Sequence, residues 1–128
     1  MNLYSKAIWR LYIYTSNIFN TLKFKLMIEY RVECLVHYTK AQEWEAYFVE
    51  HHLQDVMDTG CFTGYHFAKD TEAEGNSVKF VTSYYCDSFD ILEKYQNEFS
   101  AKLKEDCLSK FEGKFTAIRS VLHIIKQK

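Results

Sequence analysis

Two residues near the middle of the chain have the types and the spacing that acid–base chemistry requires. His52 and Asp55 lie three positions apart, a spacing that brings side chains together on a helix. An imidazole oriented by a carboxylate can exchange protons near neutral pH, and it can also bind a metal or a haem iron. The alternatives are a buried histidine that is hydrogen-bonded to Asp55 or to a backbone carbonyl, and an ordinary helical contact.

Four further residues are candidates for binding a ligand. Arg119 lies between apolar neighbours, so its charge needs an acidic ligand, a carboxylate across a dimer, or a structural ion pair. Trp44, Tyr65 and Tyr84 combine apolar rings with polar tips, which suits the wall of a pocket. Packing in the core or at an interface is the alternative for each ring.

Several classes of function lack their sequence signals. The five His and four Cys are scattered, and neither HExxH nor CxxC occurs, so we expect no metal site and no cofactor. The Gly-rich phosphate loop and the GxSxG motif are also missing. Residues 27–128 carry 12 basic and 17 acidic side chains, and this acidic balance argues against nucleic acid as a partner.

Hydrophobic periodicity predicts six elements that position these residues. Strands are expected at residues 28–37, 61–69, 77–86 and 114–125. Helices are expected at residues 40–58, after a capping box of Thr39 and Gln42, and from Asp87 or Ser88 to Phe111. The order β-α-β-β-α-β predicts an α+β, ferredoxin-like fold with a four-stranded antiparallel sheet and two helices on one face.

The helical wheel of residues 40–58 gives His52 a direction. An apolar arc includes Trp44 and Leu53, and His52 lies inside it, between Phe48 and Val56. We therefore expect His52 to point toward the sheet. His51, about 100° away on the wheel, is expected to face solvent.

The last strand is apolar on both sides, although two helices can cover only one face of the sheet. Phe115 and Val121 lie on one side of this strand, and Ile118 and Leu122 lie on the other. Aromatic residues make up 17% of the chain, more than a small single core needs. We therefore expect a homodimer that forms through the open face of the sheet.

Residues 1–26 differ from the rest of the chain because they contain four basic residues and no acid. We expect the domain to occupy residues 27–128 and residues 1–26 to be an extension, either disordered or not translated. The extension is too polar to span a bilayer. Cysteines without CxxC pairs predict reduced, buried thiols in a cytoplasmic protein with no membrane partner.

The runs Glu43-Trp44, His52 to Phe62, Tyr84 to Ser88, and Phe111 through Arg119 resemble a small bacterial family, domain of unknown function 4286. Its members typically begin two or three residues before the first strand, near Met27 here. The helix–His–turn–Gly–strand pattern is also similar to the dimeric α+β barrel superfamily. That resemblance implies the fold and the dimer more strongly than a function, because the superfamily includes cofactor-free monooxygenases, haem-degrading enzymes, lactone isomerases and regulators.

The sequence therefore predicts a cytosolic dimeric α+β barrel protein that acts as a small binding or interaction module. The alternative is a cofactor-independent monooxygenase or isomerase-like enzyme acting on a small apolar or acidic molecule. It would use His52 and Asp55 as acid and base, with Arg119 as an electrostatic aid. Haem binding through His52 is a third possibility.

Overall fold

The structure, a computed structural model, describes residues 27–72 and 74–128, so the expected extension at 1–26 lies outside the described residues. The strands are β1 (Met27–His37), β2 (Gly64–Lys69), β3 (Ser77–Cys86) and β4 (Phe115–Ile124). The helical segments are η2 (Tyr38–Lys40), α2 (Ala41–Tyr47), η3 (Phe48–His52), α3 (Leu53–Met57), α4 (Phe89–Glu98) and α5 (Ser100–Phe111).

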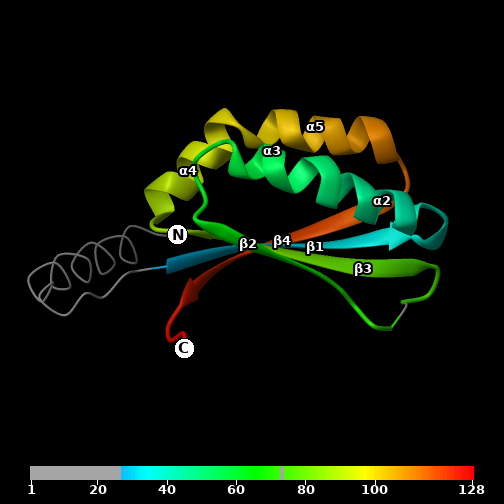
Figure 1. The fold of residues 1–128 in the computed structure, drawn as a ribbon, viewed down its shortest axis with the longest axis horizontal. Coiled ribbons are helices and arrows are strands. Elements are labelled where there is room, and N and C mark those ends of the chain that lie inside the picture. The colour runs from blue at the N-terminus through cyan, green and yellow to red at the C-terminus, as the bar shows by residue number, and fades with distance from the viewer. Residues whose placement is uncertain (1–26, 73) are drawn as a thin grey trace, which may run out of the picture.

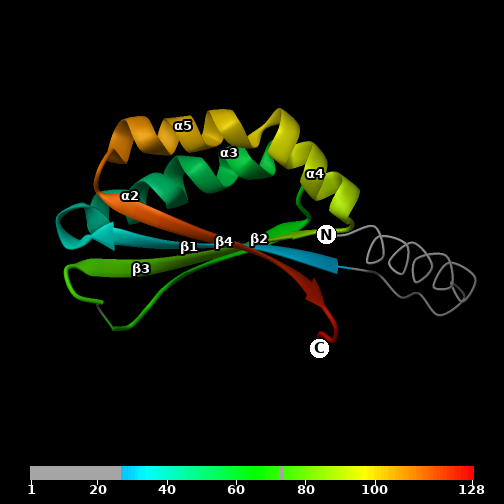
Figure 2. The same cartoon turned by 180° about the vertical axis from the view of Figure 1, so that it is seen from behind.

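The strands form one antiparallel sheet in the order β2-β3-β1-β4. The helical layer lies on one face of this sheet, and within the described residues no helix covers the opposite face (Figure 1, Figure 2). The β-α-β-β-α-β order and the one-sided helical layer are therefore confirmed. β2 and β4 are the two edge strands.

Strand register decides which side chains face the helices. Val32 of β1 pairs with Thr82 of β3 and with Arg119 of β4, and cross-strand partners point to the same side of a sheet. This side is buried beneath the helices. On the open side, Ile118 and Leu122 of β4 are 65% and 37% exposed, which confirms that the last strand is apolar on both faces.

The first helix is not uniform. The helix expected over residues 40–58 is present, but in its middle η3 is a π turn, where the Leu53 N–H donates to the Phe48 carbonyl, five residues back. In an α-helix, each four-residue step overshoots a full turn by about 40°. A π turn contains more residues per turn than an α-helix, so it reduces the change in direction around the helix axis between residues four positions apart. As a result Phe48, His52 and Val56 all stay buried.

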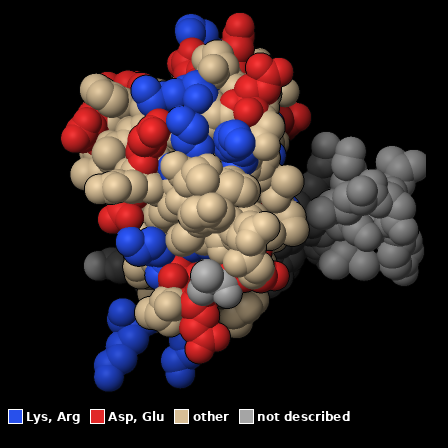
Figure 3. Space-filling model, turned by 90° about the vertical axis from the view of Figure 1, so that its right-hand side faces the viewer, with Lys and Arg blue, Asp and Glu red and all other residues tan. Residues whose placement is uncertain are grey.

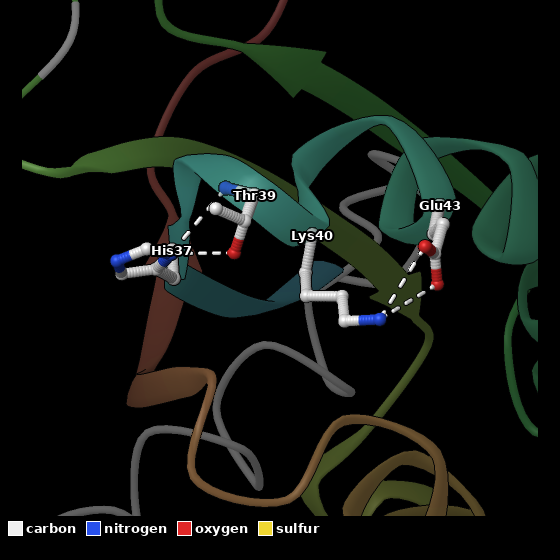
Figure 4. A network of polar contacts seen from close by, with 4 residues as sticks. All are labelled: His37, Thr39, Lys40 and Glu43. Atoms are coloured by element: carbon white, nitrogen blue, oxygen red, sulfur yellow. Dashed lines mark hydrogen bonds and ion pairs between the residues drawn. The ribbon is translucent and has the colours of Figure 1, made fainter.

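The predicted capping box of Thr39 and Gln42 is wrong. The Thr39 hydroxyl lies 2.7 Å from Nδ1 of His37, and the Thr39 backbone N–H donates to the same nitrogen (Figure 4). His37 ends β1, so its imidazole competes for the hydroxyl that the box requires. The N-cap of α2 is Lys40, which makes no side-chain cap and instead pairs with Glu43 at 3.3 Å.

The second helix begins as expected but is interrupted. The Ser88 hydroxyl accepts a hydrogen bond from the Ile91 N–H at 3.2 Å, so Ser88 is the predicted N-cap. The single helix expected to reach Phe111 breaks at Phe99, whose φ is −123°. The Ser100 hydroxyl donates to the Gln96 carbonyl at 2.9 Å, a backbone contact that bends helices.

The second strand starts later than expected. Gly60 takes a φ of 74° after the first helix, the left-handed conformation that favours glycine. Residues 61–63 then lie outside the strand, and β2 begins at Gly64 rather than at Cys61. Phe62 is buried and contacts Tyr95 edge to face, with ring centroids 4.8 Å apart, so packing of its ring takes precedence over the strand pattern.

The core lies between the sheet and the helices, with Trp44, Phe80 and Phe111 among its largest fully buried side chains. All four cysteines are buried and form no disulfide, as expected. No helix formed by the described residues has the length and apolar character needed to cross a membrane. On the face shown in Figure 3, Lys and Arg side chains are interspersed with Asp and Glu around a central area of uncharged residues.

Candidate ligand-binding cavity

A cavity of about 320 Å³ lies between the helices and the sheet. It is at the lower end of the size range of small-molecule sites. Exposed residues of α5 and β4, including Lys104 and Arg119, mark its mouth. Its lining comprises Tyr30, Val32, Cys34, Trp44, Phe48, His52, Thr82, Tyr84, Tyr95, Leu103, Lys104, Cys107, Leu108, Phe115, Thr116, Ala117 and Arg119.

Short side chains in the middle of the sheet account for this space. Cys34 faces Ala117 in the β1–β4 pairing, and Val32 faces Thr82 in the β1–β3 pairing. Larger rings, those of Tyr30, Tyr84 and Phe115, flank this short row and also line the cavity.

His52 is buried, as its position on the wheel predicted, and it is 8% exposed. Its partner differs from both expected alternatives, because Nδ1 lies 3.5 Å from the Cys107 thiol. The Tyr47 side chain also acts on this thiol and opposes the rise in its pKa that burial causes. A thiol and an imidazole nitrogen at this distance form a weak hydrogen bond.

Burial keeps this group of side chains uncharged. Loss of hydration lowers the pKa of His52 from 6.5 to about 4, although Asp55 and Asp106 favour its charged form. Burial also raises the pKa of the Cys107 thiol to about 12. At neutral pH the cavity therefore contains a neutral imidazole beside a neutral thiol.

Asp55 does not join His52. Its side chain is exposed, and no hydrogen bond joins the two residues. The i, i+3 spacing places Asp55 on the solvent side of the helix while His52 faces inward. His51 is exposed, as expected.

Arg119 projects from β4 on the helix-facing side. Its charge opposes the rise in pKa that burial causes at Tyr30 and Cys34. No carboxylate among residues 27–72 and 74–128 forms an ion pair with it. The intramolecular ion pair considered for Arg119 is therefore not seen in the described part of the chain.

Two of the three candidate aromatic residues line the cavity. Trp44 and Tyr84 belong to its wall, whereas Tyr65 on β2 is outside it and 48% exposed. Burial raises the pKa values of Tyr84 and Tyr95 well above the usual range. These hydroxyls stay protonated, so they can donate hydrogen bonds.

Trp44 has an unusual polar atom. The residue is 1% exposed, and its Nε1–H is buried with no hydrogen-bond acceptor among the described residues. Its ring lies 4.7 Å from those of Phe48 and Phe115 and 5.0 Å from that of Phe111.

Sequence reasoning did not single out Tyr30, Lys104 and Cys107 as site residues. The alternation of the first strand placed Tyr30 on the buried face, and the apolar stripe of the second helix included Cys107. Neither pattern could show that the two residues border one space. Within the described residues, no group of three or more His, Cys, Asp or Glu side chains could hold a metal ion.

The sheet order, the one-sided helices and the cavity between them define a ferredoxin-like α+β fold, the fold of dimeric α+β barrel protomers. Solved structures support this class. SnoaB, a cofactor-independent oxygenase from Streptomyces nogalater, is 10% identical, with a TM-score of 0.59 over 80% of this chain and 96% of its own. An EthD-like protein from Ralstonia eutropha is 16% identical, with a TM-score of 0.58 over 82% and 97%.

A third structure, described as a dimeric ferredoxin-like protein from an uncultured marine organism, is 8% identical, with a TM-score of 0.55 over 82% of this chain and 100% of its own. The chain belongs to the family described as Domain of unknown function (DUF4286), whose model matches residues 27–125. No curated protein matches the sequence.

Proposed function

We propose that this protein binds a small, largely apolar acid in the cavity beneath its helices. One observation carries the proposal: the lining includes two cations, Arg119 and Lys104, and no carboxylate, although residues 27–128 are acidic overall. The aromatic walls provide apolar surface, and a guanidinium at the mouth suits a carboxylate or an enolate.

The binding unit in this proposal is a homodimer assembled through the open face of the sheet. Ile118 and Leu122 leave apolar surface on that face. The solved structure described as a dimeric ferredoxin-like protein supports a dimer of this fold. Four buried thiols without a disulfide support a reducing, cytoplasmic location.

A catalytic role is the second candidate, and the fold shared with a cofactor-independent oxygenase supports it. A pKa of about 4 makes His52 a weak base at neutral pH, and Asp55 is not placed to assist it. Haem binding through His52 is disfavoured because a cavity of about 320 Å³ suits one or two rings rather than a tetrapyrrole. Binding is therefore preferred to catalysis.

Titration calorimetry with 4-isopropylbenzoate and its neutral analogue 4-isopropylbenzamide tests the proposal. We expect the acid to bind more tightly than the amide. Arg119→Gln should weaken binding of the acid about tenfold, since one charge-assisted hydrogen bond contributes about 1.5 kcal/mol. Lys102→Gln removes an equal charge from an exposed site on α5 and should leave the affinity unchanged. Equal affinities of wild type and Arg119→Gln would contradict the proposal.

A further inference from the structure

We propose that the hydroxyls of Tyr84 and Tyr95 select acids that carry a carbonyl oxygen next to the acid group. This inference rests on the proposed function and narrows its ligand class to aromatic 2-oxo acids. Both tyrosines line the cavity together with Arg119, so a ligand that fills the cavity meets two neutral hydroxyl groups as well as a cation.

The two hydroxyls lack a hydrogen-bond partner but are not sealed inside the core. Tyr84 and Tyr95 are 3% and 5% exposed, and no hydrogen bond within residues 27–72 and 74–128 uses either hydroxyl. Neither oxygen is among the fully enclosed polar atoms that lack a partner. Each oxygen therefore remains accessible to a water-sized molecule.

The cavity is the space that these hydroxyls reach. Tyr84 projects from β3 on the helix-facing side of the sheet, and Tyr95 belongs to α4 in the helical layer. Arg119, at the mouth, acts electrostatically on the Tyr95 hydroxyl. The groups that act in the same way on the Tyr84 hydroxyl all line the cavity, and they are Tyr30, Cys34, Tyr95 and Cys107. The two hydroxyls and the guanidinium therefore border one space.

Both phenols are available as donors at neutral pH. Burial raises the pKa values of Tyr84 and Tyr95 above the usual range, so the hydroxyls keep their protons. A ligand that fills a cavity displaces water from accessible hydroxyls, and this costs affinity unless the ligand replaces the lost hydrogen bonds. A carbonyl oxygen has two lone pairs, so one oxygen can accept from both hydroxyls.

The acceptor belongs beside the acid group rather than at the far end of the ligand. The Tyr95 hydroxyl interacts electrostatically with Arg119 as well as with Tyr84, so the neutral donors begin next to the cation. In a 2-oxo acid the carbonyl is bonded directly to the carboxylate. The carboxylate meets Arg119, the carbonyl oxygen accepts from the two tyrosines, and the aromatic ring occupies the apolar part of the cavity, which includes Val32 and Leu103.

Titration calorimetry of the full-length protein with benzoylformate and phenylacetate tests the inference, because phenylacetate has a methylene group in place of the carbonyl. We expect benzoylformate to bind about tenfold more tightly. The double substitution Tyr84→Phe with Tyr95→Phe should make the two affinities equal. Tyr65→Phe removes a hydroxyl from a tyrosine that is 48% exposed and outside the cavity, and it should retain the preference.

A spectroscopic measurement on the wild-type protein does not depend on the folding of any variant. Hydrogen bonds to a carbonyl oxygen move the ¹³C resonance of its carbon downfield. Benzoylformate labelled with ¹³C at the keto carbon should therefore show a downfield shift when it binds. A keto resonance that stays at its free position in the bound state would overturn the role of the two hydroxyls.

The outcomes separate the inference from the proposed function. If benzoylformate and phenylacetate bind equally and both depend on Arg119, the role of Tyr84 and Tyr95 is overturned and the acid site stands. A preference that survives the double substitution, or binding of 4-isopropylbenzoate alone, also overturns it. If none of the three acids binds, or if binding ignores Arg119→Gln, the proposed function fails and the inference fails with it.

Discussion

At the scale of the residue, environment changes what a side chain can do. His52 has the type and the position of an acid–base group, yet burial lowers its pKa to about 4 and pairs it with a neutral thiol. Arg119 is exposed and lies at the mouth of the cavity rather than inside the core. The same cavity therefore combines a neutral interior with a cationic entrance, which suits binding of an acid.

His52 should make stability depend on pH. Its pKa is lower in the folded state than its ordinary value of 6.5, so the unfolded chain takes up a proton first as the pH falls. Stability is fully present above about pH 6.5 and falls as the pH approaches 4. We expect the His52 contribution to decrease by about 2 kcal/mol between pH 7 and pH 5.

Urea unfolding at several pH values measures this effect. His52→Leu should remove this part of the pH dependence, whereas His51→Leu, at an exposed position on the same helix, should retain it. Parallel pH profiles for wild type and His52→Leu would show that His52 is protonated equally in both states.

At the scale of the element, local irregularities place the site residues. His52 lies in the π turn of η3, and π turns are frequent at functional sites. The break at Phe99 divides the second helix, and α5 contributes Leu103, Lys104 and Cys107 to the cavity. A uniform helical period would not reproduce these irregularities.

The start of α4 gives a prediction at this scale. Ser88 caps the helix through its hydrogen bond with the Ile91 N–H, so Ser88→Ala should lower the free energy of unfolding by about 1 kcal/mol. Ser88→Asp keeps an acceptor at the N-cap and should retain most of the stability. Chemical denaturation compares the three proteins, and equal stability of wild type and Ser88→Ala would contradict the role of the cap.

At the scale of the whole molecule, the helical layer protects one face of the sheet and leaves the other open (Figure 1). Ile118 projects from the open face and is 65% exposed. A second copy would bury this surface, and a two-fold axis would place the same residues on both sides of the interface.

Ile118→Lys should convert the proposed dimer to a monomer, because two-fold symmetry places two unpaired ammonium groups in one apolar interface. Val49→Lys is the control, since Val49 is 63% exposed but lies in η3, away from the open face. We expect sedimentation velocity to show a dimer for wild type and Val49→Lys, and a dissociation constant at least tenfold higher for Ile118→Lys. A wild-type monomer would exclude this assembly.

The sequence by itself determined the order of the elements, the buried face of the first strand and the inward direction of His52. These follow from periods of two and of about 3.6 residues, which are local properties of the chain. It did not determine the competition of His37 for Thr39, the π turn or the break at Phe99, because the hydrophobic period does not show local polar contacts such as His37 with Thr39 and Ser100 with Gln96.

Only the tertiary structure decided how the site is assembled. The pairing of strands brings Tyr30 to Arg119, and the packing of α5 on η3 brings Cys107 to His52 across 55 positions in the chain. The cavity exists because four short side chains from three strands lie together beneath the helices. Sequence patterns indicate which side of its strand or helix a residue faces. The volume left between the helices and the sheet depends on the packing of all the side chains together.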